Sequence, residues 1–348
     1  MAGRTQEIPT VRPEYRASQA GLLARAGVAL SVALLVFLIP VLTTPVWDGR
    51  IGAAAIFAII GLSINVITGY AGQVSLGHQA FVGIGAFMSA FMVRSSGAHA
   101  SFFVAVPVAG LTGAALALAL GAIALRIRGL YLALITLAFG LVAQGTIFHW
   151  RQFTGGRAGT PAPRPAGFES NQAYAYLCLL FVAFFLLIDW RLSKSKAGRA
   201  IECVRGDERV AATLGVNVIA YKLLAFAVGG FIAGVAGSLF AHQTQIVSAS
   251  TFGFTTALVW VAMAVVGGLR SRAGVVIGSA FFALFPYFLQ SVVHTLDKTA
   301  SDATLAGYTP LVAAVLLLAT LTRYPGGIAQ LILPIRRWLA GGPFRSWG

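Results

Sequence analysis

Long apolar runs recur along most of the chain, and polar or basic residues separate them. A helix needs about 20 residues to cross a hydrocarbon core about 30 Å thick, and several runs are long enough. Because 58% of the residues are hydrophobic and only 10% are charged, a water-soluble fold of this size could not hide so much apolar surface. The sequence therefore predicts an all-α protein that crosses a membrane many times.

Ten stretches are candidate membrane spans. They are Gly27–Leu42, Ile51–Gly69, Leu76–Val93, Phe102–Leu125, Leu130–Phe148, Ala173–Asp189, Leu223–Ala241, Thr256–Val266, Val275–Val293 and Pro310–Leu321. The predicted fold class is a polytopic transmembrane helical bundle of about ten spans. A broken or re-entrant segment near residues 69–81 is a candidate part of this fold. Pairs of glycines four residues apart within spans, such as Gly230 and Gly234, indicate close helix packing.

The net charge of +15 comes from basic residues near the ends of the apolar runs. A nucleic-acid-binding protein would gather such residues on one soluble face, so no nucleic-acid partner is predicted. If the N-terminus is cytoplasmic and each span reverses the side, most basic loops fall inside, as the positive-inside rule requires. The exceptions are Arg151, Arg157 and Arg164, which fall outside.

The predicted organisation is a cytoplasmic N-terminal tail at 1–26, a transmembrane domain at 27–322 and a cytoplasmic C-terminal tail at 323–348. A long cytoplasmic loop at 191–222 belongs to the transmembrane domain. No cleavage site of the A-x-A type follows the first apolar run, so this run is expected to remain as a membrane anchor.

The segment from Gly69 to Phe81, GYAGQVSLGHQAF, is polar and glycine-rich although it lies between two apolar spans. Non-helical backbone at membrane depth is tolerated where protein buries it or where it lines a water-filled cavity. If Ser75 caps the next helix, the free N–H groups there would suit a substrate carboxylate. A cytoplasmic surface loop with a capping serine and an exposed histidine explains the composition equally well.

If the segment lies at membrane depth, a translocation pathway is predicted along Gln73, Ser75, His78 and Gln79. A zwitterion that crosses a region of low dielectric needs hydrogen-bonding partners for both charged ends. Neutral partners suit such a route because they do not hold the solute too firmly.

The loop at 191–222 carries apolar residues at helical spacing on both sides of Gly206-Asp207. This pattern predicts two short amphipathic helices joined by a turn, ending at Gly215. Their apolar face, from Ile201, Val204, Val210 and Leu214, could rest on the membrane surface or insert into a groove of a soluble partner. The candidate coupling residues are Ile201, Val204, Gly206, Asp207, Val210, Leu214 and Gly215.

Several catalytic motifs are missing from the sequence. It has no G-x-x-x-x-G-K-[ST] phosphate loop, so this chain is not expected to hydrolyse ATP in the P-loop manner. H-E-x-x-H and G-x-S-x-G are also missing, and no catalytic residue, metal site or cofactor is predicted. His242 and His294 are predicted in outer loops, which leaves His78 as the only histidine near a site at membrane depth.

Three classes of function are weighed: a transporter pore, an ion-coupled secondary transporter and a membrane-embedded enzyme. A proton-driven carrier commonly uses a relay of embedded acidic or histidine residues, and an enzyme needs a nucleophile, metal ligands or a carboxylate pair at one depth. The sequence shows neither a clear proton relay nor such a set of catalytic groups, so the transporter pore is favoured.

Several stretches then resemble the permease subunits of the bacterial branched-chain amino acid ABC importers, the M-type permease in particular. The resemblance covers roughly residues 50 to 330. Its motifs are the segment 69–81, GLYLALITLAF at 129–139, TGG at 154–156, the loop that ends at Leu214-Gly215, GGL at 267–269 and PGG at 325–327. The second motif adds Thr136 to the candidate pathway residues.

This resemblance implies a multi-pass subunit of the bacterial inner membrane, and the positive-inside rule predicts that both termini lie in the cytoplasm. The implied partners are membrane lipid, a sister permease of the H type, two cytoplasmic ATPase subunits and an extracytoplasmic substrate-binding protein. GGRAG at 155–159 and the basic LRSR at 269–272 depart from the usual pattern. They leave the substrate open, because related permeases serve urea, short amides and aromatic acids.

Overall fold

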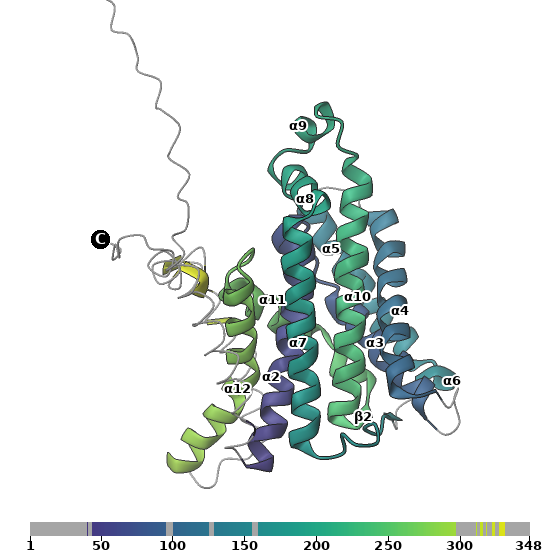
Figure 1. Ribbon diagram of the computed structural model, residues 1–348, viewed down its shortest axis with the longest axis vertical. Coiled ribbons are helices and arrows are strands. Elements are labelled where there is room, and N and C mark those ends of the chain that lie inside the picture. Colours follow the sequence, from purple (N-terminus) through teal and green to yellow (C-terminus); the bar gives the residue numbers. More distant parts are fainter. Residues whose placement is uncertain are drawn as a thin grey trace, which may run out of the picture.

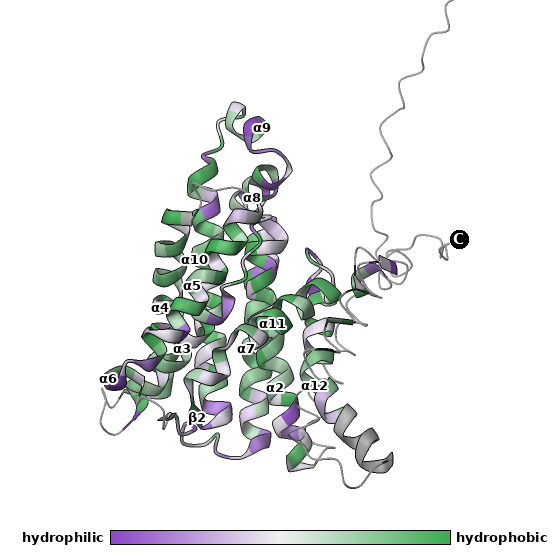
Figure 2. Cartoon of the chain, turned by 180° about the vertical axis from the view of Figure 1, so that it is seen from behind, coloured by the Kyte–Doolittle hydropathy of each residue, from purple (hydrophilic) through white to green (hydrophobic). Residues whose placement is uncertain are grey.

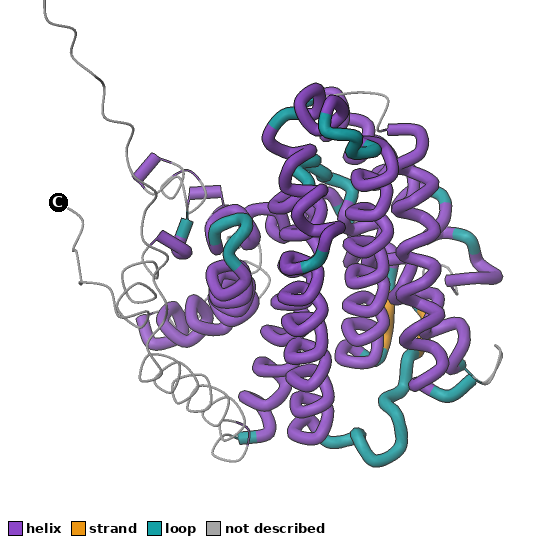
Figure 3. The backbone as a smooth tube through the Cα atoms, turned by 45° about the horizontal axis from the view of Figure 1, so that its top comes forward, coloured by secondary structure: helices purple, strands orange, loops and turns teal. Residues whose placement is uncertain are grey.

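The computed structural model describes residues 44–94, 100–124, 129–154 and 159–296, together with residues 40, 311, 314–315, 318, 322–323 and 327–330. Within these residues the chain is almost entirely helical. The long helices run side by side along one direction, and most loops lie at the two ends of the bundle (Figure 1 and Figure 3). The predicted all-α fold class is confirmed.

Five helical stretches in the described part are long and apolar enough to cross a membrane. They are α2 (Pro45–Ile64) continued by the π-helix η1 (Asn65–Tyr70), α4 (Phe102–Ala124), α5 (Leu130–Gly145) with η2 (Ile147–His149), α7 (Asn171–Lys194) and α10 (Val218–Thr244). Shorter apolar helical stretches are α3 (His78–Val93), α11 (Phe254–Gly267) and the part Arg272–Phe288 of α12 (Arg272–Leu296). The predicted spans Gly27–Leu42 and Pro310–Leu321 lie almost wholly outside the described residues, so a count of ten stays a prediction.

Short elements lie at the ends of the bundle. α8 (Lys196–Gly206) and α9 (Glu208–Thr213) project from one end, at the top of Figure 1. At the opposite end lie α6 (Arg151–Thr154), η4 (Ala249–Phe252) and two short strands, β1 (Thr160–Pro161) and β2 (Ile246–Val247). The strands pair antiparallel, with Thr160 opposite Val247, and so connect the loop before α7 to the loop after α10.

Small residues bring the helices together, as predicted. α10 packs against α3 and α4, while α2 packs against α7 and α12. A Cβ atom at Gly234 would overlap the carbonyl oxygen of Ala109 on α4, and one at Gly230 would overlap the Cβ of Ala117. Because lipid gives helices no hydrophobic reason to associate, this close backbone contact supplies the packing energy.

The outer surface of the bundle suits lipid. Large apolar side chains on α4, α5 and α7 are exposed, among them Phe103, Leu111, Leu141, Leu180 and Phe184. Hydrophobic residues extend along the helices, whereas hydrophilic residues gather mainly toward the ends (Figure 2). An exposed apolar surface of this size is expected where the solvent is a bilayer.

A partly buried ion pair joins distant parts of the chain near the α8 end. Asp189 on α7 is fully buried, and it accepts a hydrogen bond of 2.8 Å from the hydroxyl of Tyr70 at the end of η1. Its partner in the ion pair is Arg272, the first residue of α12, which also donates to the Ser193 hydroxyl. This cluster ties α12 to α7 and to the end of α2–η1.

Candidate functional site

The polar segment at 69–81 turns back into the bundle. Residues 71–77 are non-helical, and α3 then begins at His78. The His78 Nε2 lies 3.0 Å from the Oγ of Ser63, which sits about two turns, or roughly 10 Å, before the end of η1. α3 therefore starts well inside the depth of the bundle, and the chain between the two helices follows a non-helical path to reach it.

Four of the five candidate pathway residues are fully buried: Ser75, His78, Gln79 and Thr136. Gln73 is partly exposed, and its Nε2 donates to the backbone oxygen of Ala71 at 3.2 Å. The alternative of an exposed histidine in a surface loop is therefore wrong.

A short hydrogen-bonded chain holds the start of α3. The Ser63 hydroxyl on α2 bonds to His78 and donates to the carbonyl oxygen of Gly229 on α10, at 2.7 Å. Ser63, His78 and Gly229 thus connect three helices through polar groups in an otherwise apolar interior. Such pairing is what allows polar side chains to be buried.

The predicted helix cap at Ser75 is wrong. The residue before α3 is Gly77, and no side chain caps this helix end. Instead the Thr136 Oγ1 on α5 accepts a hydrogen bond from the Leu76 N–H at 3.0 Å and donates to the Ala133 carbonyl at 2.9 Å. A Cβ at Gly77 would overlap the carbonyl oxygen of Thr136, so the contact between the segment and α5 requires a glycine there.

Ser75 and Gln79 are buried without partners for their polar atoms. The Ser75 Oγ and both amide atoms of Gln79 make no hydrogen bond within the described part of the chain. A buried amide or hydroxyl without a partner destabilises a protein by about 1–3 kcal/mol. The Nδ1 of His78 is likewise unpaired within the described residues, so the segment holds four unsatisfied buried polar atoms, next to the well-paired Thr136.

A cavity of about 800 Å³ lies between this segment and the α8–α9 end. Its walls include Gln73 and Gly72 from the segment, Leu132 from α5, and the turn between α8 and α9. Arg205 on α8 donates to the carbonyl oxygen of Gly69 beside it. Burial and the nearby charge of Arg270 both lower the pKa of Arg205 from its ordinary value.

The two predicted helices of the 191–222 loop are confirmed as α8 and α9, joined at Gly206-Asp207. The Asp207 carboxylate caps α9 by accepting from the N–H groups of Arg209 at 2.7 Å and Val210 at 3.2 Å. After α9 the chain passes through Gly215, whose φ of 78° favours glycine.

The predicted single apolar face of this loop is wrong. Ile201 and Val204 on α8 are each only 2% exposed. Val210 and Leu214 are 53% and 69% exposed. Ile201 and Val204 therefore pack in the interior of this chain, and of the four predicted residues Val210 and Leu214 alone present an apolar surface to the outside.

The sequence analysis missed a second buried histidine. His242 lies inside α10, not in an outer loop, and is fully buried. Its Nε2 is 3.0 Å from the Ser89 Oγ, and its Nδ1 is 2.6 Å from the carbonyl oxygen of Pro163. The spacing of Ser238 and His242, four residues apart on one helix face, is the signal that could have extended the predicted span.

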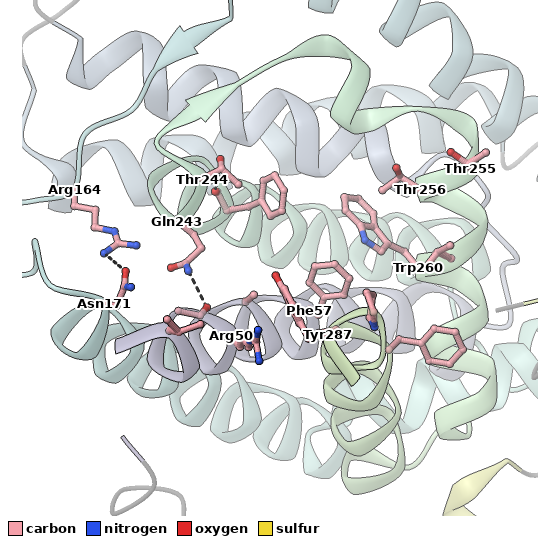
Figure 4. A pocket seen from close by; sticks show the side chains of 18 residues that line it. Arg50, Phe57, Arg164, Asn171, Gln243, Thr244, Thr255, Thr256, Trp260 and Tyr287 are labelled. Atoms are coloured by element: carbon pink, nitrogen blue, oxygen red, sulfur yellow. Dashed lines mark hydrogen bonds between the residues drawn. The ribbon is translucent and has the colours of Figure 1, made fainter. Parts of the chain in front are cut away.

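A larger cavity of about 950 Å³ lies toward the opposite end, between α2, α10, α11 and α12 (Figure 4). Its lining includes Arg50, Arg164, Gln243, Trp260 and Tyr287. No sequence motif pointed to this cavity, because its residues come from five separate parts of the chain.

A bundle of apolar helices with a polar segment turned into its interior, and with a cavity toward each end, is the architecture of a membrane permease. The described residues include no group of three or more His, Cys, Asp or Glu side chains placed to hold a metal ion.

The chain belongs to the family of permease components of branched-chain amino acid transport systems, whose model matches residues 48–321. The family membership that the sequence motifs indicated is thereby confirmed.

Two bacterial relatives carry the name LivM, high-affinity branched-chain amino acid transport system permease protein. The protein of Salmonella typhimurium is 32% identical over 257 residues, covering 66% of this chain and 60% of the relative. The protein of Escherichia coli is 32% identical over 252 residues, covering 64% of this chain and 59% of the relative.

A probable branched-chain amino acid transport permease protein, LivH, of Methanocaldococcus jannaschii is 26% identical over 281 residues, covering 77% of this chain and 86% of the relative. The chain thus spans about three fifths of the length of the two LivM proteins it matches. No solved structure matches it.

Proposed function

We propose that this chain forms the translocation pathway of an ABC importer for branched-chain amino acids, or for closely related solutes, in the bacterial inner membrane. The observation that carries the proposal is the buried polar segment 69–81 with its unpaired Ser75 and Gln79. The names of the relatives support the substrate class.

The proposed pathway runs from the interior of the bundle past Gln79, Ser75 and His78 to Gln73 and the 800 Å³ cavity. Thr136 holds the segment in place from α5. The unpaired amide of Gln79 and hydroxyl of Ser75 are neutral groups that can hydrogen-bond a passing carboxylate or ammonium group. They carry no fixed charge, so the solute is not trapped between them.

Energy would come from two separate ATPase subunits that dock on the α8–α9 end, because this chain has no phosphate loop. A sister permease would complete the pore, and an extracytoplasmic binding protein would deliver the substrate. Within this chain, Gly206, Asp207 and Gly215 set the geometry of the coupling loop. The exposed Val210 and Leu214 would contact the ATPase.

The α8–α9 end is proposed to face the cytoplasm, as are the tails at 1–26 and 323–348. In a Cys203→Ser background, a cysteine at Thr213 should react with an impermeant maleimide only from the cytoplasmic side, and one at Ala166 only from outside. Both positions are exposed, and the remaining Cys178 is buried. Equal labelling of both positions from one side would contradict this orientation.

The function is tested by purifying the tagged chain from its native host and reconstituting what comes with it. We expect two ATPases and a sister permease to copurify, and leucine uptake into proteoliposomes to require ATP and the binding protein. Uptake by this chain alone, driven by an ion gradient, would instead establish the secondary-transporter alternative.

A further inference from the structure

The 950 Å³ cavity toward the outer end of the bundle combines positive charge with apolar walls. Arg50 and Arg164 line it, and no carboxylate is among the lining residues that the structure describes. Phe57, Val259 and Phe282 add apolar surface. Its volume falls within the roughly 300–1,000 Å³ typical of sites for small molecules.

Arg164 is held by the protein itself. Its Nη1 donates to the Asn171 Oδ1 at 2.8 Å (Figure 4) and also to the backbone oxygen of Glu169 at 3.0 Å. These acceptors are neutral, so they fix the guanidinium without cancelling its charge. Arg164 therefore supplies a permanent positive charge to one side of the cavity.

Arg50 is held in a different way, by aromatic rings. Its guanidinium carbon lies 4.7 Å from the centroid of Trp47 and 4.6 Å from that of Tyr287. Its buried Nε has no hydrogen-bond partner within the described residues. Cation–π contact positions a guanidinium but leaves its N–H groups able to bind an anion.

Trp260 gives the cavity a second donor without a partner. The side chain is 1% exposed, and its Nε1 makes no hydrogen bond within the described part of the chain. Its ring packs edge-to-face against the ring of Phe57, with the ring centroids 6.3 Å apart. An acceptor bound in the cavity would satisfy a donor whose burial is otherwise unfavourable.

We propose that this cavity binds the carboxylate of an amino acid with an apolar side chain as it enters from outside. Arg50 pairs with the carboxylate, the Trp260 N–H donates to it, and Arg164 adds favourable potential. The apolar side chain contacts the wall that includes Phe57 and Phe282. This inference rests on the proposed function, and it adds a first binding site upstream of the neutral segment at 69–81.

The test uses the purified importer complex without its binding protein, in nanodiscs of phosphatidylcholine, with L-leucine as the probe. Saturation-transfer NMR measures binding, because it detects weak ligands. Leucinol, which lacks the carboxylate, is the matched ligand. We expect leucine to bind more tightly than leucinol, and Arg50→Gln to weaken leucine binding about ten-fold or more while leaving leucinol unchanged.

Arg50→Lys, which keeps the charge but loses the planar fork, should fall between wild type and Arg50→Gln. Trp260→Phe, which keeps a ring but loses the N–H, should weaken leucine binding about three-fold or more. Arg191→Gln is the control, since Arg191 also stacks on a tryptophan, Trp190, but lies at the α8 end and lines neither cavity described above.

Equal binding of leucine by wild type and Arg50→Gln, or of leucine and leucinol by wild type, would overturn the proposal. A lipid phosphate would also pair with Arg50. If nanodiscs of phosphatidylglycerol abolish leucine binding to the wild type, the occupant is a lipid and the proposal fails. If binding follows the expected pattern but the complex does not import leucine, the site stands and the proposed function fails.

Discussion

Replacing Gln79 by leucine is expected to reduce leucine import about ten-fold or more while leaving the protein as stable as before, or slightly more stable. Both amide atoms of Gln79 are buried and have no hydrogen-bond partner among the described residues, so an apolar side chain of similar size removes an unfavourable burial. Import falls because the passing solute loses a hydrogen-bonding partner. A ten-fold slower import corresponds to a transport barrier that is higher by about 1.4 kcal/mol. Uptake and thermal unfolding in detergent are the two measurements.

Thr136→Val is the contrasting variant. It deprives the Leu76 N–H of its acceptor, and the unfolding temperature should therefore drop along with uptake. If Gln79→Leu imports leucine at the wild-type rate, Gln79 is not part of the pathway. If its stability falls in step with uptake, the role of Gln79 is structural.

Leu214→Glu is expected to detach the ATPase subunits and abolish ATP-dependent uptake while the transmembrane bundle stays intact. Leu214 is 69% exposed and contributes little to the interior of this chain. A charge in the centre of an apolar contact costs about 2 kcal/mol or more, which weakens association roughly 30-fold. Copurification of the ATPases and the substrate-stimulated ATPase rate measure the effect.

Ala212→Glu is the matched control for this prediction. Ala212 is also exposed, but it lies about 200° around the helix from Val210 and so faces away from the Val210–Leu214 surface. Ile201→Ala should act differently, by lowering the stability of the bundle, because Ile201 is 2% exposed. Normal ATPase recovery with Leu214→Glu would mean that the subunits dock elsewhere.

Local patterns in the sequence were enough to predict the apolar helices of the described part of the chain, the glycine-mediated packing and the two helices of the 191–222 loop. Each depends on residues a few positions apart, which helical periodicity records directly. The polar segment at 69–81 was also recognisable, because its composition contradicts its position between two apolar spans.

Features that depend on distant residues were not predictable in this way. The acceptor for the Leu76 N–H is Thr136, which lies on another helix, so the sequence suggested Ser75 as a local cap. Likewise the division of the coupling loop into a buried pair at Ile201 and Val204 and an exposed pair at Val210 and Leu214 depends on how α8 packs on the bundle. Periodicity gives an apolar face but not the surface that covers it.

The ion pair between Asp189 and Arg272 bears on how the protein is synthesised. Arg272 is added to the growing chain well after Asp189, once α8, α9, α10 and α11 have been made. Until then α7 carries an acidic side chain near its end without its basic partner, and burial of such a charge is strongly unfavourable. The full set of partners that surrounds the buried Asp189 in the folded bundle is therefore complete only once the start of α12 has been made. We therefore expect a chain truncated before Arg272 to hold the Asp189 end of α7 less stably than the full chain does.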